Sequence, residues 1–183
     1  AGSRQGLMHR QPGCSPGDGP RRSERHSRTW RSLLQPPFNV ESLQMPRIEF
    51  YVLSSSDAEG RLRAACQLAL KAWSAGLPVF LRGSDEAQCG ELDEMLWRFK
   101  AERFVPHDLH SDAPLSPVAL GIDEAPSREQ GVLINLGSSL SPHVERFSRI
   151  IEIVNQQPEL LSACRENFRT YRQHGYDPQR VEL

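Results

Sequence analysis

The residues that first suggest chemistry are His107, Asp108 and His110, because imidazole and carboxylate groups are common zinc ligands. A zinc site needs further ligands at helical or strand spacing, and no suitable third ligand accompanies the two histidines. The four cysteines do not supply one, since they lie far apart and form no CxxC or paired Cys/His spacing. We therefore expect no metal site and no cofactor, and we expect reduced thiols.

Catalytic groups are equally hard to assemble from this sequence. Asp93 and Glu94 are adjacent, so on a helix their carboxylates diverge by about 100° and cannot act as a facing acid and base. No GxSxG sequence positions a serine nucleophile. The pattern as a whole favours an interaction module over an enzyme.

Nucleotide binding lacks its usual motifs. The turn after residues 47–53 reads SSSDAEG rather than GxGxxG, and no GxxxxGK[ST] sequence occurs. The glycine and two serines at residues 137–139 could bind an anion, although a loop leading into a helix explains them better. A nucleotide-dependent enzyme therefore remains the alternative hypothesis, with little support from the motifs.

A row of arginines lies near the C-terminus, where Arg165, Arg169 and Arg172 follow one another at steps of four and three. Beside it runs an apolar stripe at helical spacing: Leu160, Leu161, Cys164, Phe168 and Tyr171. Such a row can simply be a solvated face that complements the helix dipole. The more specific interpretation is a groove for a short acidic peptide that ends in an apolar residue, because arginine binds carboxylates in bidentate fashion.

Residues 90–109 (GELDEMLWRFKAERFVPHDL) form the other informative stretch. The end of an amphipathic helix is indicated by apolar residues at steps of four and three: Leu92, Leu96 and Phe99. After it, Pro106 biases the chain towards an extended form. Trp97 and Phe104 would then lie on a stiff ledge suited to docking a partner. The alternative from periodicity alone is that both rings fill the core.

Composition separates the chain into two parts. Residues 1–44 are rich in Arg, Ser, Pro and Gly, lack a sustained apolar period, and carry seven arginines against three carboxylates. Residues 45–183 carry 15 basic and 20 acidic side chains, a net charge of −5. The chain begins with Ala, and Met45 directly precedes the first strand-like run. We therefore expect residues 1–44 to be a disordered leader, either artificial or an upstream extension, and residues 45–183 to form a single domain.

Charge and hydropathy also restrict the function. No segment has the roughly 20 consecutive apolar residues that cross a bilayer, and no signal-peptide core is present. A basic leader and an arginine row could bind single-stranded DNA directly. The net charge of −5 on residues 45–183 argues against this, because affinity for DNA comes largely from neutralised phosphates.

Strand and helix signals alternate along residues 45–183. Strands are predicted at residues 47–53, 78–82, 118–122 and 132–136. Helices are predicted at residues 58–75, 142–155 and 158–174, and a further helix is predicted to begin after an N-cap at Ser84. Gly76 and Gly175 mark the ends of the first and the last of these helices. This alternation predicts an α/β fold: a Rossmann-like three-layer sandwich with a mostly parallel sheet and helices on both faces, without a nucleotide site.

Three motifs in this order resemble one family. LDExLW at residues 92–97, FVPHxL at residues 104–109 and RExFRxYRxxG at residues 165–175 are similar to those of the chi subunit of the bacterial DNA polymerase III holoenzyme. The resemblance covers Met45 to about Pro178. It implies the same Rossmann-like fold without nucleotide binding, and a non-catalytic role in DNA replication in the bacterial cytoplasm, at the nucleoid-associated replisome.

The resemblance also implies partners. Chi subunits pair with the psi subunit of the clamp loader, or with a repair helicase through the same surface, and bind the acidic C-terminal tail of single-stranded DNA-binding protein. DNA is then contacted only indirectly. Carried over, the psi or helicase surface includes Trp97, Phe104, Val105, Pro106 and His107.

The implied pocket for the tail of single-stranded DNA-binding protein uses Val154, Arg165, Phe168 and Arg169. The two arginines would hold the aspartates and the terminal carboxylate, while Phe168 and Val154 would pack on the terminal Phe of the tail. Two departures from the family pattern occur here. Leu161 stands where a basic residue is expected, and Phe168 replaces a tyrosine, which keeps the ring and loses the hydroxyl.

Overall fold

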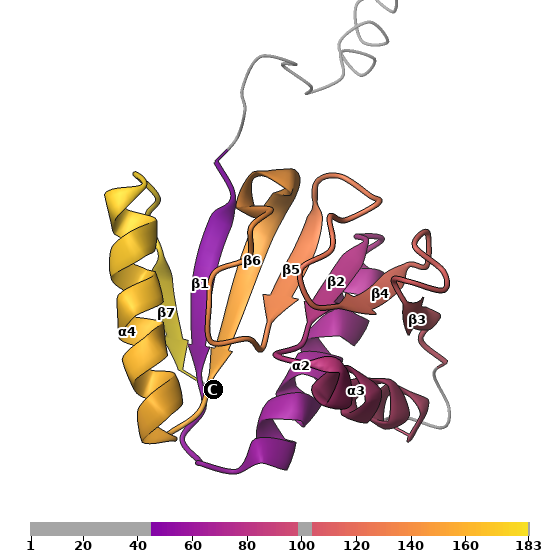
Figure 1. Cartoon of the computed structure of the whole chain (residues 1–183), viewed down its shortest axis with the longest axis horizontal. Coiled ribbons are helices and arrows are strands. Elements are labelled where there is room, and N and C mark those ends of the chain that lie inside the picture. The colour runs from indigo at the N-terminus through magenta and orange to yellow at the C-terminus, as the bar shows by residue number, and fades with distance from the viewer. Residues whose placement is uncertain (1–44, 99–103, 183) are drawn as a thin grey trace, which may run out of the picture. The chain divides into compact units, whose positions relative to one another are not determined.

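The computed structural model describes residues 45–98 and 104–182. Within them the chain forms one seven-stranded sheet with the strand order β3-β4-β2-β5-β6-β1-β7, and every pairing is parallel (Figure 1). The strands are β1 Arg47–Val52, β2 Val79–Arg82, β3 His107–Leu109, β4 Val118–Gly121, β5 Gly131–Asn135, β6 Phe147–Val154 and β7 Gln179–Glu182.

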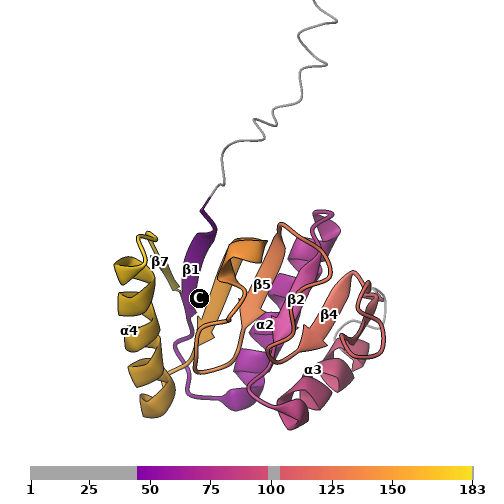
Figure 2. The same cartoon turned by 45° about the horizontal axis from the view of Figure 1, so that its top comes forward.

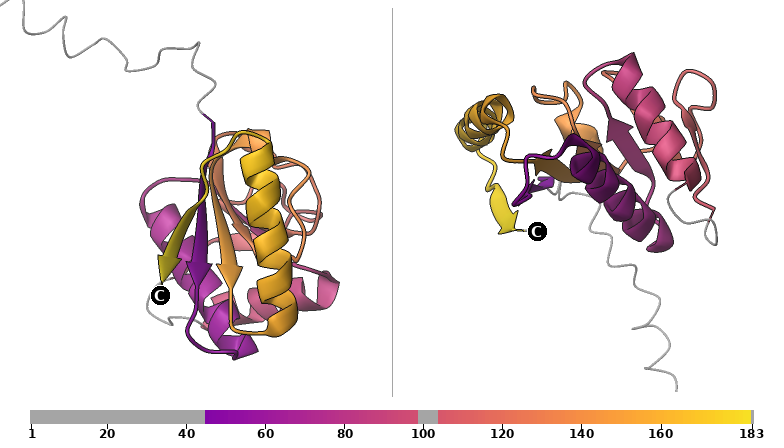
Figure 3. Two further views of the ribbon diagram at one scale, coloured as in Figure 1. Left: turned by 90° about the vertical axis from the view of Figure 1, so that its left-hand side faces the viewer. Right: turned by 90° about the horizontal axis from the view of Figure 1, so that it is seen from below.

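Helices cover both faces of this sheet. The described helices are α2 Ala58–Ser74, α3 Glu86–Arg98, the short 3₁₀ helix η1 Val144–Arg146 and α4 Pro158–Gln173. One apolar core joins α2 and α3 to one face, and a second core joins α4 to the other. Viewed from the side, the strands lie between α2 and α4 (Figure 3). The predicted three-layer α/β sandwich is confirmed.

Local sequence explains where the helices begin and end. Asp57 caps α2 by accepting a 2.7 Å hydrogen bond from the backbone N–H of Gly60. Gly76 follows the helix with a φ of +80°, a conformation that glycine adopts without steric cost. The cap predicted for α3 is one residue too early, because the carboxylate of Asp85, not Ser84, accepts from the N–H of Gln88.

The helix predicted at residues 142–155 is wrong. Only Val144–Arg146 forms a helical turn, and Phe147–Val154 is β6, the longest strand of the sheet. β6 lies between β5 and β1 and is buried on both faces, so its sequence FSRIIEIV does not alternate between apolar and polar residues. A strand with such a pattern cannot be distinguished from a buried helix by periodicity alone. The β-branched isoleucines and valine of this segment favour a strand.

The two edge strands, β3 and β7, have no counterpart among the predicted elements. Each is only three or four residues long and contains charged side chains, so neither has a detectable period. Short, charged edges are common in natural sheets because they discourage further strand pairing. Residues 1–44 and Phe99, which the sequence assigns to a leader and to the stripe of α3, lie outside the described residues. No described helix is long and apolar enough to cross a membrane.

Candidate functional site

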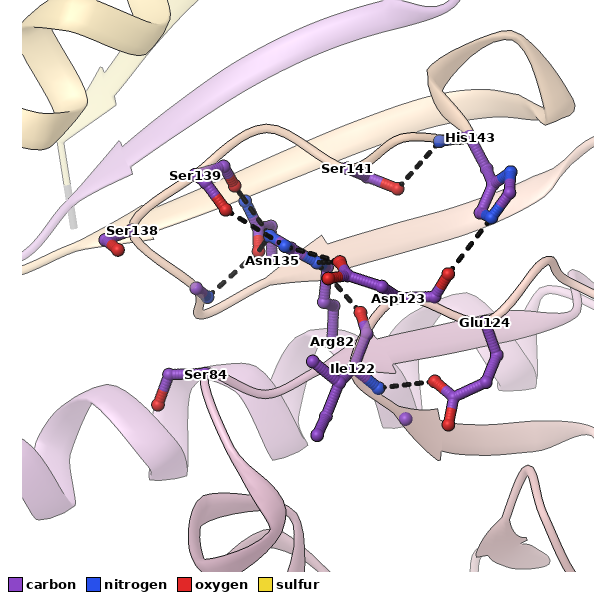
Figure 4. Close-up of polar contacts among 12 residues, drawn as sticks. Arg82, Ser84, Ile122, Asp123, Glu124, Asn135, Ser138, Ser139, Ser141 and His143 are labelled. Atoms are coloured by element: carbon purple, nitrogen blue, oxygen red, sulfur yellow. Dashed lines mark hydrogen bonds and ion pairs between the residues drawn. The ribbon is translucent and has the colours of Figure 1, made fainter.

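The carboxyl ends of the central strands, where doubly wound folds usually bind ligands, are occupied by the protein's own polar groups (Figure 4). The buried guanidinium of Arg82, at the end of β2, donates to the backbone carbonyls of Ile122 and Ser139. It also donates to the side chains of Asp123, Asn135 and Ser139. This network fills the place where a nucleotide phosphate would approach the sheet.

The turn at residues 137–139 belongs to this network. The Ser139 carbonyl points inward and accepts hydrogen bonds from Arg82 and from Asn135. A side chain on Gly137 would meet the Arg82 guanidinium at 2.7 Å, which explains the glycine. The turn continues towards η1 and β6 and not into the expected helix. Because the Ser139 carbonyl of this turn accepts a hydrogen bond from the adjoining Arg82, the turn has a structural role.

A buried carboxyl group connects this network to α4. Glu152 of β6 accepts hydrogen bonds of 2.8 Å from Asn135 and from the phenol of Tyr171. Burial raises the pKa of Glu152 to about 7, and the two hydrogen bonds and the nearby guanidinium groups of Arg82 and Arg61 offset only part of that effect. Helix α4 is therefore anchored to the sheet by a carboxyl that titrates near neutrality.

A groove of about 420 Å³ lies beside α4. Its lining comes from β1, the segment after β6, α4 and β7: Phe50, Val52, Gln156, Leu161, Cys164, Arg165, Phe168, Arg169 and Arg180. The floor is apolar and aromatic, and three arginines surround it. Such a lining suits a ligand that carries negative charge beside an apolar group. We name it the α4 groove.

The aromatic floor of the α4 groove is preorganised. The rings of Phe50 and Phe168 lie 5.3 Å apart at a tilted angle, and the guanidinium of Arg172 lies 5.1 Å from the centre of the Phe168 ring. Cys164 also lines the groove, but burial raises the pKa of its thiol to about 11, so the thiol is protonated at neutral pH. The groove therefore has the properties of a binding surface more than those of a reaction centre.

Three of the four residues predicted for the tail pocket meet in the α4 groove: Arg165, Phe168 and Arg169. Val154 does not line it, because its side chain is buried in the core on the α4 side of the sheet, with 5% exposed. Leu161, noted as a departure from the family pattern, lines the groove and makes that part of it apolar.

Several lining residues are not among those predicted from the sequence, and Arg180 is the most important of them. Arg180 lies on β7, a short strand without a recognisable period, and reaches the groove only because β7 pairs with β1. Phe50 and Val52 of β1 were likewise part of a predicted strand whose partners could not be known. Their roles follow from pairing between distant segments.

The residues predicted for the second surface separate into exposed and buried groups. Trp97 and Phe104 are 59% and 60% exposed, and their rings are 5.4 Å apart. The alternative in which both rings fill the core is therefore wrong. Pro106 is half-buried beside them. We name Trp97, Phe104 and Pro106 the aromatic ledge.

Val105 and His107 lie beneath the ledge and not on it. Val105 is 2% exposed, and the His107 ring contacts Trp97 edge to face at 4.9 Å. The Nδ1 atom of His107 lies 2.6 Å from the carbonyl of Val105, and its Nε2 atom lies 3.4 Å from a carboxylate oxygen of Asp93. Both side chains are buried and support the ledge, whose exposed rings are those of Trp97 and Phe104.

The two surfaces lie at opposite edges of the sheet. The α4 groove adjoins β1 and β7, and the aromatic ledge lies between the end of α3 and β3, the strand at the other edge. The ribbon shows α4 and β7 on one side of the sheet and α3 on the other (Figure 2). The surfaces also belong to helices on different faces. Across seven strands spaced about 4.8 Å apart, the two edges are roughly 30 Å from each other.

Comparison with known proteins decides the family. The model of the family described as "DNA polymerase III chi subunit, HolC" matches residues 45–179. The chain belongs to the DNA polymerase III chi subunit family. The resemblance inferred from the three motifs is thus confirmed, and the match covers β1 to β6 and all three long helices of the described structure and ends at the first residue of β7.

Individual chi subunits agree with this assignment. The chain is 45% identical to DNA polymerase III subunit chi of Pseudomonas aeruginosa over 135 residues, which are 74% of this chain and 95% of the relative. It is 29% identical to the Escherichia coli subunit over 140 residues, 73% of this chain and 95% of that protein. The Haemophilus influenzae subunit is 30% identical over 132 residues, 70% and 92% of the two chains.

Proposed function

We propose that this chi-family chain is a non-catalytic adaptor in the DNA polymerase III holoenzyme of the bacterial cytoplasm. It joins the clamp loader, through the psi subunit, to the acidic C-terminal tail of single-stranded DNA-binding protein. The observation that supports this most is the placement of two unlike surfaces at opposite edges of one rigid sheet. An adaptor needs two sites that can be occupied together.

The α4 groove has the chemistry that an acidic tail requires. Arg165 and Arg169 flank Phe168 on one helix, so charged donors lie directly beside an aromatic floor. A peptide that ends in an apolar residue can place its last side chain on the floor and its carboxylates on the guanidinium groups. Charge-assisted hydrogen bonds of this kind are stronger than neutral ones, and they weaken with salt at an exposed site.

The aromatic ledge suits a protein partner. Exposed tryptophan and phenylalanine side chains in contact with each other are unusual on a free surface, and aromatic residues are the commonest hot spots of protein interfaces. We assign this ledge to psi, and to a repair helicase as the alternative occupant. One ledge cannot hold both at once, so the two partners would compete.

The first experiment is a calorimetric titration of the full chain with a short acidic peptide ending in Ile-Pro-Phe. The control is the same peptide without its final Phe. Micromolar binding that needs the Phe and weakens with salt would support the α4 groove as a tail site. Absence of binding would refute that half of the proposal and leave the ledge alone.

Bridging requires a second measurement, because either site could bind by itself without joining two partners. Sedimentation of the chain with psi and a labelled acidic peptide is expected to give one species that contains all three. If psi displaces the peptide, the two sites are not independent and the adaptor role is wrong. A parallel titration with nucleoside triphosphate tests the alternative enzyme hypothesis, and tight binding there would revive it.

A further inference from the structure

Arg180 lies on the same side of the sheet as the aromatic floor of the α4 groove. In the parallel pairing of β1 with β7, Arg180 is the register partner of Phe50. Residues opposite each other in neighbouring strands point to the same face, so the Arg180 side chain is directed to the face that α4 covers. Phe50 in turn contacts Phe168 of α4, and all three residues line the groove.

The groove therefore has cationic groups from two different elements. Arg165 and Arg169 belong to α4, and Arg180 belongs to β7, the edge strand that pairs with β1. The Arg180 side chain is 65% exposed, and among the described residues its carboxylate partner is Glu182, at 3.0 Å. Glu182 is itself exposed, so the guanidinium keeps donors available for a ligand.

From this geometry we infer that Arg180 is a specificity residue of the α4 groove that pairs with an acidic side chain of the bound peptide. The inference rests on the proposed function, since it names how the same site recognises an acidic tail. It adds a determinant outside α4 that no motif of the sequence contains.

Arg180 and the two arginines of α4 recognise different parts of the peptide. The terminal carboxylate is attached to the same residue whose side chain enters the floor, so it lies closest to the arginines that flank Phe168 on α4. The peptide residues that precede the terminal one extend from the aromatic floor towards the exposed edge of the groove. The guanidinium of Arg180 comes from β7 and is exposed, so we assign it to those acidic side chains rather than to the terminal carboxylate.

The test is a set of mutant cycles on the full chain with three peptides. The first is the acidic peptide ending in Ile-Pro-Phe, the second has its aspartates changed to asparagines, and the third carries a C-terminal amide. Arg180→Ala is expected to weaken the acidic and the amidated peptides about three- to tenfold, the range between exposed and charge-assisted pairs. It is expected to weaken the asparagine peptide less than about twofold.

Matched variants control for net charge. Arg63 on α2 is an exposed arginine paired with one carboxylate, Glu59, at 2.7 Å, and it does not line the α4 groove. Arg63→Ala removes the same charge and is expected to leave all three affinities unchanged. Arg180→Lys keeps the charge and is expected to restore most of the loss. Because Arg180 is exposed on an edge strand, the melting temperature of Arg180→Ala should match that of the wild type.

Glu182 offers a second, independent variant. Glu182→Gln releases Arg180 from its internal partner and is expected to strengthen binding of the acidic peptide about two- to threefold, while Glu59→Gln has no effect. An unchanged affinity in Glu182→Gln counts against the inference.

The outcomes separate this inference from the proposed function. Equal losses for the acidic and asparagine peptides in Arg180→Ala, or a loss that disappears with the amidated peptide, would overturn the assignment of Arg180 while the groove still binds the tail. Failure of the wild type to bind the acidic peptide at all would overturn both.

Discussion

The phenol of Tyr171 donates a hydrogen bond of 2.8 Å to the buried carboxyl of Glu152, and this contact fixes α4 to the interior strand β6. Helix α4 carries two of the three arginines of the α4 groove and Phe168, one of the two rings of its aromatic floor. The position of the groove therefore depends on a polar contact in the core between α4 and the sheet. The two residues of this contact do not line the groove.

Stability should depend on pH through Glu152. Its pKa is raised from 4.5 to about 7 in the folded state, so the folded chain binds more protons than the unfolded chain between these values. The stability contributed by the protonated form is complete below about pH 4.5 and is lost as the pH rises through about 7. The loss is expected to reach about 3 kcal/mol.

Urea unfolding of the wild type and of Glu152→Gln at several pH values between 5 and 8 measures this effect. The difference in free energy of unfolding between wild type and variant should fall as the pH rises, because only the wild type carries the titrating carboxyl. Parallel curves for the two proteins would mean that Glu152 does not titrate in this range.

Arg165→Ala should weaken binding of the acidic peptide by about 1.5–3 kcal/mol if its guanidinium makes a charge-assisted hydrogen bond with a carboxylate. The side chain is exposed, so folding and psi binding should remain close to those of the wild type. Calorimetry gives the affinity, and Arg63→Ala again serves as the charge control. A variant that no longer folds would contradict the surface role of Arg165.

Trp97→Ala and Phe104→Ala should each weaken the psi complex by about 2 kcal/mol or more, as aromatic hot spots commonly do. Peptide binding in the α4 groove should not change. Met45→Ala is a suitable control, because Met45 is 58% exposed and precedes β1, five strands away from β3. Loss of thermal stability in the free chain would instead show that the rings support the fold.

Leu161→Lys should strengthen binding of the acidic peptide about three- to fivefold and make binding more sensitive to salt, because it adds a cation to the apolar part of the α4 groove. Leu161→Met keeps the size and adds no charge, so it should leave the salt dependence unchanged. Equal behaviour of the two variants in titrations at two salt concentrations would show that this position does not contact a carboxylate.

Much of the fold was predictable because its signals are local. The cap at Asp57, the glycine stops and the apolar periods of α2 and α4 all depend on neighbours within a few residues. The prediction of a helix over β6 fails because a strand buried on both faces loses the alternation that marks a strand. Its ambiguity is resolved only by the strands that lie on either side.

The candidate site, too, is predictable only where its residues are close in sequence. Arg165, Phe168 and Arg169 share one helix, so their spacing predicts a common face. Arg180 joins them through the pairing of β7 with β1, which brings together residues about 130 positions apart. The other predicted residues differ in burial. Val105, His107 and Val154 are buried, and the sequence alone does not distinguish such supporting residues from exposed ones that can contact a partner.

The parallel order of the sheet has a consequence for synthesis of the chain on the ribosome. β1 is the first of the described strands to be made, yet both of its neighbours, β6 and β7, come after Arg146. At about 5–20 residues per second, β1 waits roughly 5–20 s for β6, with Ile48 and Phe50 still without their final partners. Native pairing of β1 therefore cannot precede translation of β6, and until then this segment is a natural substrate for chaperones.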